Sequence, residues 1–185
     1  MNSGLSAKFM LLVLVMALAS CASTFRYEPE QESEILLLGR VEAEFSDWPV
    51  VHGINVNGTR RSNFEVEVRH NDSGEILQLE TVPVHGYVYL ENAQPGEYTF
   101  IVVRYRDETE SGAWREIFDV PRYNFTITDQ PGVHNIGILV WESTPNSTRY
   151  RSYGQSAVAR TFAERYDESR WLAFDWHNIP LVSNR

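Results

Sequence analysis

The sequence predicts a mainly β protein, an antiparallel β-sandwich followed by a short C-terminal helical segment. Three observations lead to this fold class: short runs in which apolar and polar residues alternate, turn residues between those runs, and helical spacing confined to the C-terminal region. The chain has 185 residues, 43% of them hydrophobic and 22% charged, a composition typical of a folded globular protein. We expect a signal peptide over residues 1–20, a tether over 21–33, the sandwich over 34–142, a linker over 143–155 and the helical segment over 156–177.

The N-terminal region carries a targeting signal. Lys8 precedes an unbroken apolar run of eleven residues, 9–19. As a helix this run is too short to cross a hydrocarbon core of about 30 Å, whereas it suits the apolar region of a signal peptide. The sequence therefore predicts export from the cytoplasm.

The residues after this run, Leu18-Ala19-Ser20-Cys21, resemble the lipobox of bacterial lipoproteins. The resemblance implies cleavage between Ser20 and Cys21, attachment of diacylglycerol to the Cys21 thiol, and acylation of the freed amine with a fatty acid such as palmitate. Two or three acyl chains make a stable membrane anchor, whereas one gives only marginal binding. A plain secretory signal with a chance cysteine, or an uncleaved anchor, is the alternative.

The residue after the cysteine bears on location. Ala22 stands where an aspartate would resemble an inner-membrane retention signal of Gram-negative lipoproteins. We therefore expect a lipid-anchored protein of the bacterial cell envelope, with the outer membrane and the periplasm favoured if the organism is Gram-negative. Residues 22–33 are polar and acidic, and at about 3.3 Å per residue they could hold the domain up to roughly 40 Å from the bilayer.

Charge and composition exclude several classes of function. The 25 acidic residues exceed the 16 basic ones, for a net charge of −9, so we expect no nucleic-acid partner. The one cysteine rules out an internal disulfide and any metal site with several cysteine ligands. If Cys21 is lipidated and Lys8 is removed, the mature chain has no free thiol and no lysine, which excludes cysteine and lysine catalysis.

The predicted sandwich begins with the apolar run 35–38. A second strand follows at 64–69, where Phe64, Val66 and Val68 alternate with charged residues, the pattern of a half-buried strand. Asn71-Asp72-Ser73-Gly74 predicts the turn that ends it.

Later strands are predicted at 86–90 and 97–105, joined through the turn Gln94-Pro95-Gly96, which we expect to form a tight hairpin. Further strands are expected at 114–120, 123–128 and 135–141, the last after a Pro131-Gly132 turn. Seven or eight short strands with turns at short intervals are typical of an antiparallel sandwich.

Two of these segments carry a family resemblance. Tyr87-Val88-Tyr89-Leu90, followed by Pro95-Gly96-Glu97-Tyr98-Thr99-Phe100, is similar to a recurring feature of transthyretin-like β-sandwiches, including carboxypeptidase-regulatory-like modules. Residues 131–138 are similar to the last strand of such modules. The resemblance implies an Ig-like or transthyretin-like fold over residues 34–142, and it implies a fold far more than an activity.

The C-terminal region changes character. Residues 143–155 are polar and predict a linker, whereas Val158, Phe162 and Tyr166 recur at helical spacing. The strand at 98–105 has apolar residues on both faces, so we expect the helical segment to cover its outer face near Ile101 and Val103. The alternative is a docking segment for a partner, with Trp171, Phe174 and Trp176 as the contacts.

We find no known catalytic motif in the sequence. The histidines, which lie at positions 52, 70, 85, 134 and 177, share no spacing typical of metal ligands, although several could converge in the fold. Glu65 and Glu67 share one strand face and are interpreted as solvated side chains rather than a catalytic pair. We expect no catalytic residue, no metal site and no cofactor besides the lipid on Cys21.

Two functions follow from these expectations. The first is a non-enzymatic binding or structural module of the envelope, whose partner is another envelope protein or a glycan. The second is an envelope hydrolase or metal-dependent enzyme with a site assembled from scattered His, Asp and Glu residues. The absence of motifs favours the first.

Overall fold

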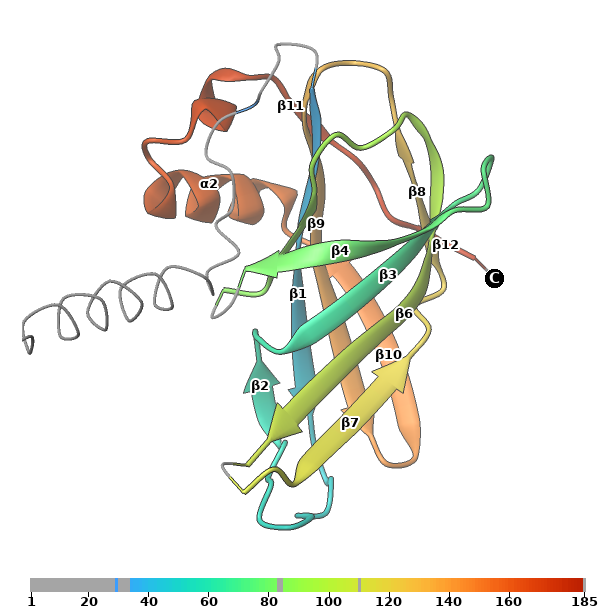
Figure 1. Ribbon diagram of the computed structural model, residues 1–185, viewed down its shortest axis with the longest axis vertical. Coiled ribbons are helices and arrows are strands. Elements are labelled where there is room, and N and C mark those ends of the chain that lie inside the picture. Colours follow the sequence, from blue (N-terminus) through green and yellow to red (C-terminus); the bar gives the residue numbers. More distant parts are fainter. Residues whose placement is uncertain (1–28, 30–33, 83–84, 110, 185) are drawn as a thin grey trace, which may run out of the picture.

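The structure is a computed structural model that describes residues 29, 34–82, 85–109 and 111–184. Figure 1 shows one strongly curled β-sheet with a short helix at one end. Within these residues the sheet has 12 strands and mixes parallel with antiparallel pairs. The predicted mainly β class and the short C-terminal helix are therefore confirmed, but in place of a two-sheet antiparallel sandwich the chain forms a curled half-barrel.

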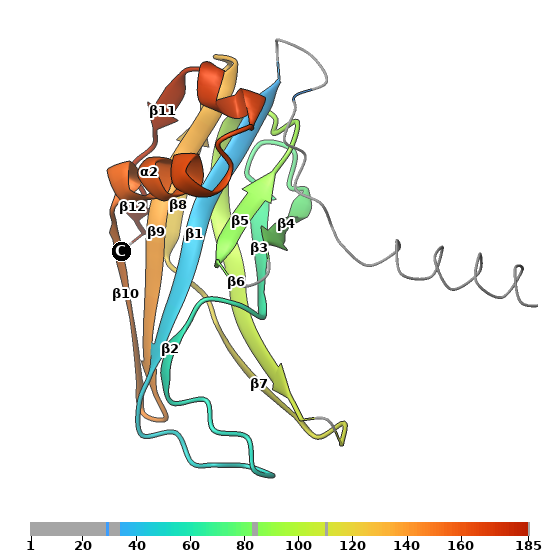
Figure 2. The same ribbon diagram turned by 90° about the vertical axis from the view of Figure 1, so that its left-hand side faces the viewer.

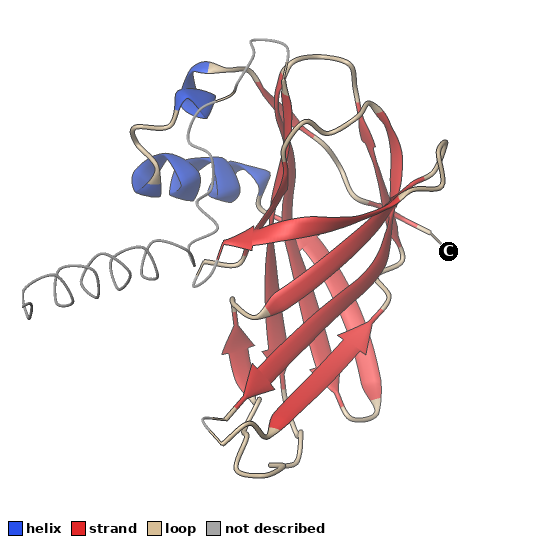
Figure 3. Ribbon diagram, in the orientation of Figure 1, coloured by secondary structure: helices blue, strands red, loops and turns tan. Residues whose placement is uncertain are grey.

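The elements, coloured by type in Figure 3, follow one another in this order: β1 (Ile35–Phe45), β2 (Gly58–Arg60), β3 (Phe64–His70), β4 (Ile76–Val82), β5 (Tyr87–Leu90), β6 (Gly96–Glu108), β7 (Trp114–Asp119), β8 (Tyr123–Ile127), β9 (Gly132–Thr144), β10 (Ser147–Tyr153), α2 (Gln155–Arg165), the 3-10 helix η1 (Arg170–Ala173), β11 (Trp176–Asn178) and β12 (Val182–Ser183). The hydrogen-bonded path across the sheet runs β10-β9-β1-β5-β4-β3-β6-β8-β12. Three strands lie off this path: β11 pairs with β9, β2 with β1, and β7 with β6.

The longest strand pairing in the described sheet is the parallel pair β1–β9, whose register runs from Ile35 opposite Gly132 to Phe45 opposite Ser143. Both strands are buried along almost their whole length. A strand that is covered on both faces has a nearly continuous apolar run in its sequence, which is common for strands in parallel pairs. The sequence expectation of antiparallel strands failed here because parallel pairing joins segments almost 100 residues apart, which local turn residues do not reveal.

Two apolar cores lie on opposite faces of the β1–β9 pair. The inner core fills the curl of the sheet and includes Leu37, Val66, Phe100, Tyr105 and Trp141. The outer core lies between β1, β5 and β9 and the C-terminal helices, which cover the outer face of the sheet in Figure 2.

The C-terminal segment covers the sheet at a different place from the one predicted. Val158, Phe162 and Trp171 pack in the outer core with residues such as Leu36 and Leu38 of β1, not near Ile101 and Val103. The prediction that this segment packs on the sheet is confirmed, and its predicted position is wrong.

A β-bulge in β6 explains the misplacement. In the register of β3 with β6, Glu67 lies opposite Val102 but Val68 lies opposite Phe100, so Ile101 is an extra residue. Phe100 before the bulge and Val103 after it both lie in the inner core, although they are three positions apart instead of two. The apolar residues that suggested a second buried face therefore come from this shift.

The predicted linker 143–155 is also replaced by ordered structure. Residues 147–153 form β10, which pairs antiparallel with β9 from Ser147 opposite Thr144 to Tyr153 opposite Ile138. This edge strand is mostly exposed, and its polar composition suits solvent. The polarity that predicted a linker reflects that exposure.

The turn at Gln94-Pro95-Gly96 does not join a hairpin. β5 pairs with β1 and β4, whereas β6 pairs with β3, β7 and β8, so residues 91–95 cross from one part of the sheet to another. Gly96 has φ of 147°, and a Cβ there would lie 2.2 Å from Nε2 of His70. Glycine is needed at this position for the crossing rather than for a hairpin.

The end of the chain connects the two sides of the half-barrel. β11 pairs in parallel with β9, and β12 pairs antiparallel with β8. Residues 176–184, which we call the tail strap, therefore run from one side of the curled sheet to the other. Within the described residues, no helix combines the length and apolar character needed to cross a membrane.

Candidate binding site

A pocket of about 390 Å³ lies under the tail strap, a size within the range of small-ligand sites. We call it the tail pocket. Its walls come from β8, the start of β9 and the strap itself. The lining residues are Glu97, Asn124, Phe125, Thr126, Thr128, Gln130, His134, His177, Asn178, Ile179, Pro180, Val182 and Asn184.

Two histidines that are 43 positions apart lie side by side in this pocket. His134 of β9 and His177 of β11 are register partners in adjacent parallel strands, and their ring centroids are 4.9 Å apart. The parallel pairing of β11 with β9 brings them together. No spacing signal in the sequence could have predicted this, because β11 has three residues and joins the sheet through tertiary contacts.

Hydrogen bonds to the preceding loop determine the tautomers of both rings. Nε2 of His134 lies 2.8 Å from the carbonyl of Gln130, and Nε2 of His177 lies 3.1 Å from that of Pro131. A carbonyl oxygen only accepts, so each Nε2 carries the proton and donates it. In the neutral rings each Nδ1 then carries a lone pair that can accept.

The Nδ1 atom of His134 is the unusual feature of the pocket. The side chain is 0% exposed, and in the described part of the chain this nitrogen has no hydrogen-bond partner. Burial lowers the pKa of His134, the neighbouring His177 lowers it further, and the bond to Gln130 opposes the shift. A buried polar atom without a partner calls for a physical explanation, such as a bound water, ion or ligand.

The opposite wall is held by a network around Asn124. Its side-chain oxygen accepts from Thr99 and Asn184, and its side-chain nitrogen donates to Glu97 at 2.9 Å. These bonds join β6, β8 and the end of the strap. The wall is therefore positioned in advance of any ligand, which reduces the entropic cost of binding.

A larger cavity of about 730 Å³ lies at the β1–β9–β10 end of the sheet, lined by Glu44, Glu142 and Arg149 among others. Its charges are already paired, since Arg149 contacts Glu142 at 2.8 Å and Arg151 contacts Glu142 and Glu44. The tail pocket, with its unpartnered buried nitrogen, is the better candidate for a binding site.

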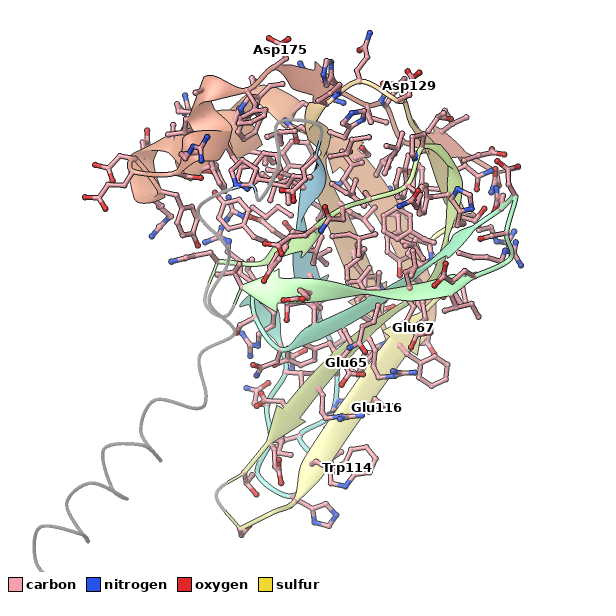
Figure 4. The ribbon with its side chains drawn as sticks, turned by 45° about the horizontal axis from the view of Figure 1, so that its top comes forward. Glu65, Glu67, Trp114, Glu116, Asp129 and Asp175 are labelled. Atoms are coloured by element: carbon pink, nitrogen blue, oxygen red, sulfur yellow. The ribbon has the colours of Figure 1, made fainter. Side chains whose placement is uncertain are left out.

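The predicted solvated face of β3 is confirmed. Figure 4 labels Glu65, Glu67 and Glu116, which lie with Arg104 and Arg106 in an ion-pair network across β3, β6 and β7. The shortest contacts are Arg104 to Glu65 at 2.8 Å and Arg106 to Glu116 at 2.9 Å. The carboxylates are neutralised by arginines, so this face offers no poised acid–base pair.

The site residues predicted from the sequence fall into two groups. Ser20 and Cys21 lie outside the described residues. Trp171 is 1% exposed, and Phe174 and Trp176 are half-buried against the same outer core. Trp171 thus packs in the outer core of this structure.

The remaining histidines take no part in the tail pocket. His70 contacts Ser73 and the carbonyl of Pro95, and His85 contacts Arg165. Over the described ranges, no group of three or more His, Cys, Asp or Glu side chains is arranged to hold a metal ion.

Comparisons with protein-family models, with curated proteins and with solved structures found no match to this chain.

Proposed function

We propose that the protein is a lipid-anchored lipoprotein of the bacterial cell envelope that acts as a non-enzymatic binding module. The observation that carries the anchor is Leu18-Ala19-Ser20-Cys21 directly after an apolar run. The start of β1, at residue 35, follows the cysteine by 14 positions. The length of this tether limits the distance between the domain and the membrane to which Cys21 is attached.

The tail pocket supports the binding role. It combines apolar walls with a few fixed polar groups, the usual composition of a small-ligand site. Asn124, His134 and His177 present these groups from three strands. Free ring nitrogens that accept hydrogen bonds, together with the ring faces, suit part of a glycan or of another envelope protein, the partner classes expected from the sequence.

The Ig-like and transthyretin-like relationship belongs to this proposal as well. It is based on the sequence segments 87–90 and 95–100 and on the antiparallel run β4-β3-β6. The parallel pair β1–β9 and the single curled sheet distinguish this chain from the antiparallel two-sheet arrangement expected at first.

The anchor is tested by Cys21→Ala in bacteria that express the full chain. Wild type should be processed, incorporate labelled palmitate and fractionate with membranes, whereas Cys21→Ala should give an unlabelled precursor or a soluble domain. Ser20→Gly is the matched control, because it keeps a small residue before the cleavage point and should behave as wild type. Unchanged labelling and membrane association of Cys21→Ala would overturn the anchor.

The binding role is tested in intact cells with a photoreactive benzoylphenylalanine at position 128, inside the tail pocket. Irradiation should give one discrete adduct whose mass identifies a glycan or a protein. The same probe at position 160, on the exposed side of α2, should give none. No adduct at 128, or equal adducts at both positions, would contradict a binding role for the pocket.

One observation favours the second candidate, a metal-dependent enzyme. The unpartnered Nδ1 of His134 beside His177 is a nitrogen pair of the kind that zinc, iron and copper bind. Metal analysis of the purified protein separates the two functions. Stoichiometric zinc or iron that is lost in His134→Gln but kept in His70→Gln would replace the binding module with the enzyme.

A further inference from the structure

Strand β7 presents an exposed apolar edge that the proposed binding role does not use. Among the described residues it pairs with β6 and with no other strand. Trp114 is 58% exposed, Phe118 66%, and Val120 just beyond the strand 53%. Figure 4 shows Trp114 at the lower end of β7, far from the tail strap.

The neighbouring strand shows how such an edge is covered in this fold. β8 and β7 both pair with the same side of β6, β8 near Gly96–Thr99 and β7 near Val103–Glu108. β12 covers the outer edge of β8, and the amide of Asn184 adds a bond to the carbonyl of Arg122. In the described part of the chain, β12 pairs with β8 and no strand covers the outer edge of β7. β7 therefore has a row of unpaired backbone groups beside exposed apolar side chains. Such an edge favours pairing with another strand.

We propose that β7 pairs with β7 of a second copy of this chain, as an antiparallel two-fold dimer with Ile117 opposite the partner's Ile117. A two-fold axis through that point makes the contact self-complementary and closed. The pairing covers the exposed β7 edge of each copy. The assembly through β7 therefore stops at two copies and does not continue as a fibre.

Complementary charges select this register. Arg115 lies opposite the partner's Asp119, and the symmetry repeats this pair of opposite charges. On the outer face, Trp114 lies opposite the partner's Val120, and Glu116 lies opposite the partner's Phe118. Directly opposed residues in antiparallel strands are the contacts that stabilise a sheet.

Neighbouring registers are worse. A shift by one residue would turn the outer face of one copy inward. A shift by two residues in one direction places Glu116 opposite the partner's Glu116, two like charges. The shift by two in the other direction places Arg115 opposite the partner's Pro121, which has no N–H to donate.

Arg115 and Asp119 have unused hydrogen-bond donors and acceptors for the contact with the partner. Arg115 already donates to the carbonyl of Pro49 and lies over the ring of Trp48, 5.0 Å from its centroid. Asp119 accepts one bond, from the amide of Val120 at 2.8 Å. A guanidinium has five N–H donors and a carboxylate about four acceptor positions, so each group can also bind its counterpart in the partner.

Sedimentation velocity of the full-length mature lipoprotein in detergent, over a range of concentrations, tests the proposal. Wild type should show a monomer–dimer equilibrium. Arg115→Asp and Asp119→Arg should each weaken the dimer by about tenfold or more, and the double variant should restore it to within about threefold of wild type. Arg160→Asp, on the exposed side of α2, is the control and should leave the equilibrium unchanged.

Phe118→Glu provides a second test, since this exposed side chain contributes little to folding and its replacement would face the partner's Glu116. It should abolish the dimer without changing the melting temperature at concentrations low enough for wild type to be monomeric, because dimer formation itself raises the melting temperature. A protein that is monomeric at every concentration would overturn the proposal. So would a dimer that the charge reversals and Phe118→Glu leave unchanged.

Discussion

At the residue scale, His134 shows how the fold changes the environment of one side chain. It is fully buried in the tail pocket, its Nε2 is bound to Gln130, and its Nδ1 has no partner in the described residues. Burial disfavours the imidazolium, so the pKa of His134 in the folded protein lies below the ordinary value of 6.5. The folded state therefore prefers the neutral ring.

This shift predicts a pH dependence of stability. Below pH 6.5 the unfolded chain binds the proton more readily than the folded chain, so the stabilising contribution of a neutral His134 is complete above that pH. It is lost as the pH falls from 6.5 toward the lower folded-state pKa. Urea denaturation at pH 7.5 and 5.5 should show a smaller loss for His134→Gln than for wild type, whereas Thr126→Ala, which changes the same pocket without removing a titratable group, should lose as much as wild type. Equal losses in all three would contradict the assignment.

At the element scale, helix α2 is held by tertiary packing rather than by its own propensity. Its N-terminal cap, Gly154, provides no side-chain hydrogen bond, and a helix of 11 residues is marginal in isolation. Val158 and Phe162 are its buried residues, and Phe162 stacks edge-on against Tyr87 and Trp176. The helix therefore depends on the outer core.

Phe162→Ala should lower the free energy of unfolding by about 3–5 kcal/mol, because it removes a buried ring and leaves a cavity in the outer core. The exposed Arg160 on the same helix gives the matched control, and Arg160→Ala should change stability by less than about 0.5 kcal/mol. Chemical denaturation of both variants checks this. Equal stabilities would mean that α2 is not packed on β1, β5 and β9.

At the scale of the whole molecule, the tail strap keeps the two sides of the half-barrel together. β11 adds to β9, β12 adds to β8, and between them Ile179 is buried in the inner core. The last residues are thus part of the fold, and they also form one wall of the tail pocket.

Deleting residues 179–185 should lower the free energy of unfolding by at least about 1.5–3 kcal/mol. This is the free energy gained when one large aliphatic side chain such as Ile179 is buried. Hydrogen exchange should accelerate in β8, whose outer edge loses β12, whereas β3 serves as the internal control and should keep its relative protection. Unchanged exchange in β8 would show that the strap does not cover that edge.

The sequence by itself determined the class of structure and the local elements of this protein. Alternation in Phe64-Glu65-Val66-Glu67-Val68 indicated β3 and its solvated face, and helical spacing from Val158 to Tyr166 indicated α2, because both patterns arise from the geometry of one element. The lipobox prediction likewise depends on a contiguous motif.

The tertiary structure alone decided how these elements combine. The parallel pairing of β1 with β9, the bulge at Ile101 and the strand character of 147–153 depend on partners distant in sequence. The tail pocket does as well, since His134 and His177 become neighbours only when β11 joins β9. Pairing energy is gained between segments far apart in the chain, whereas residue patterns report only what each segment does within itself.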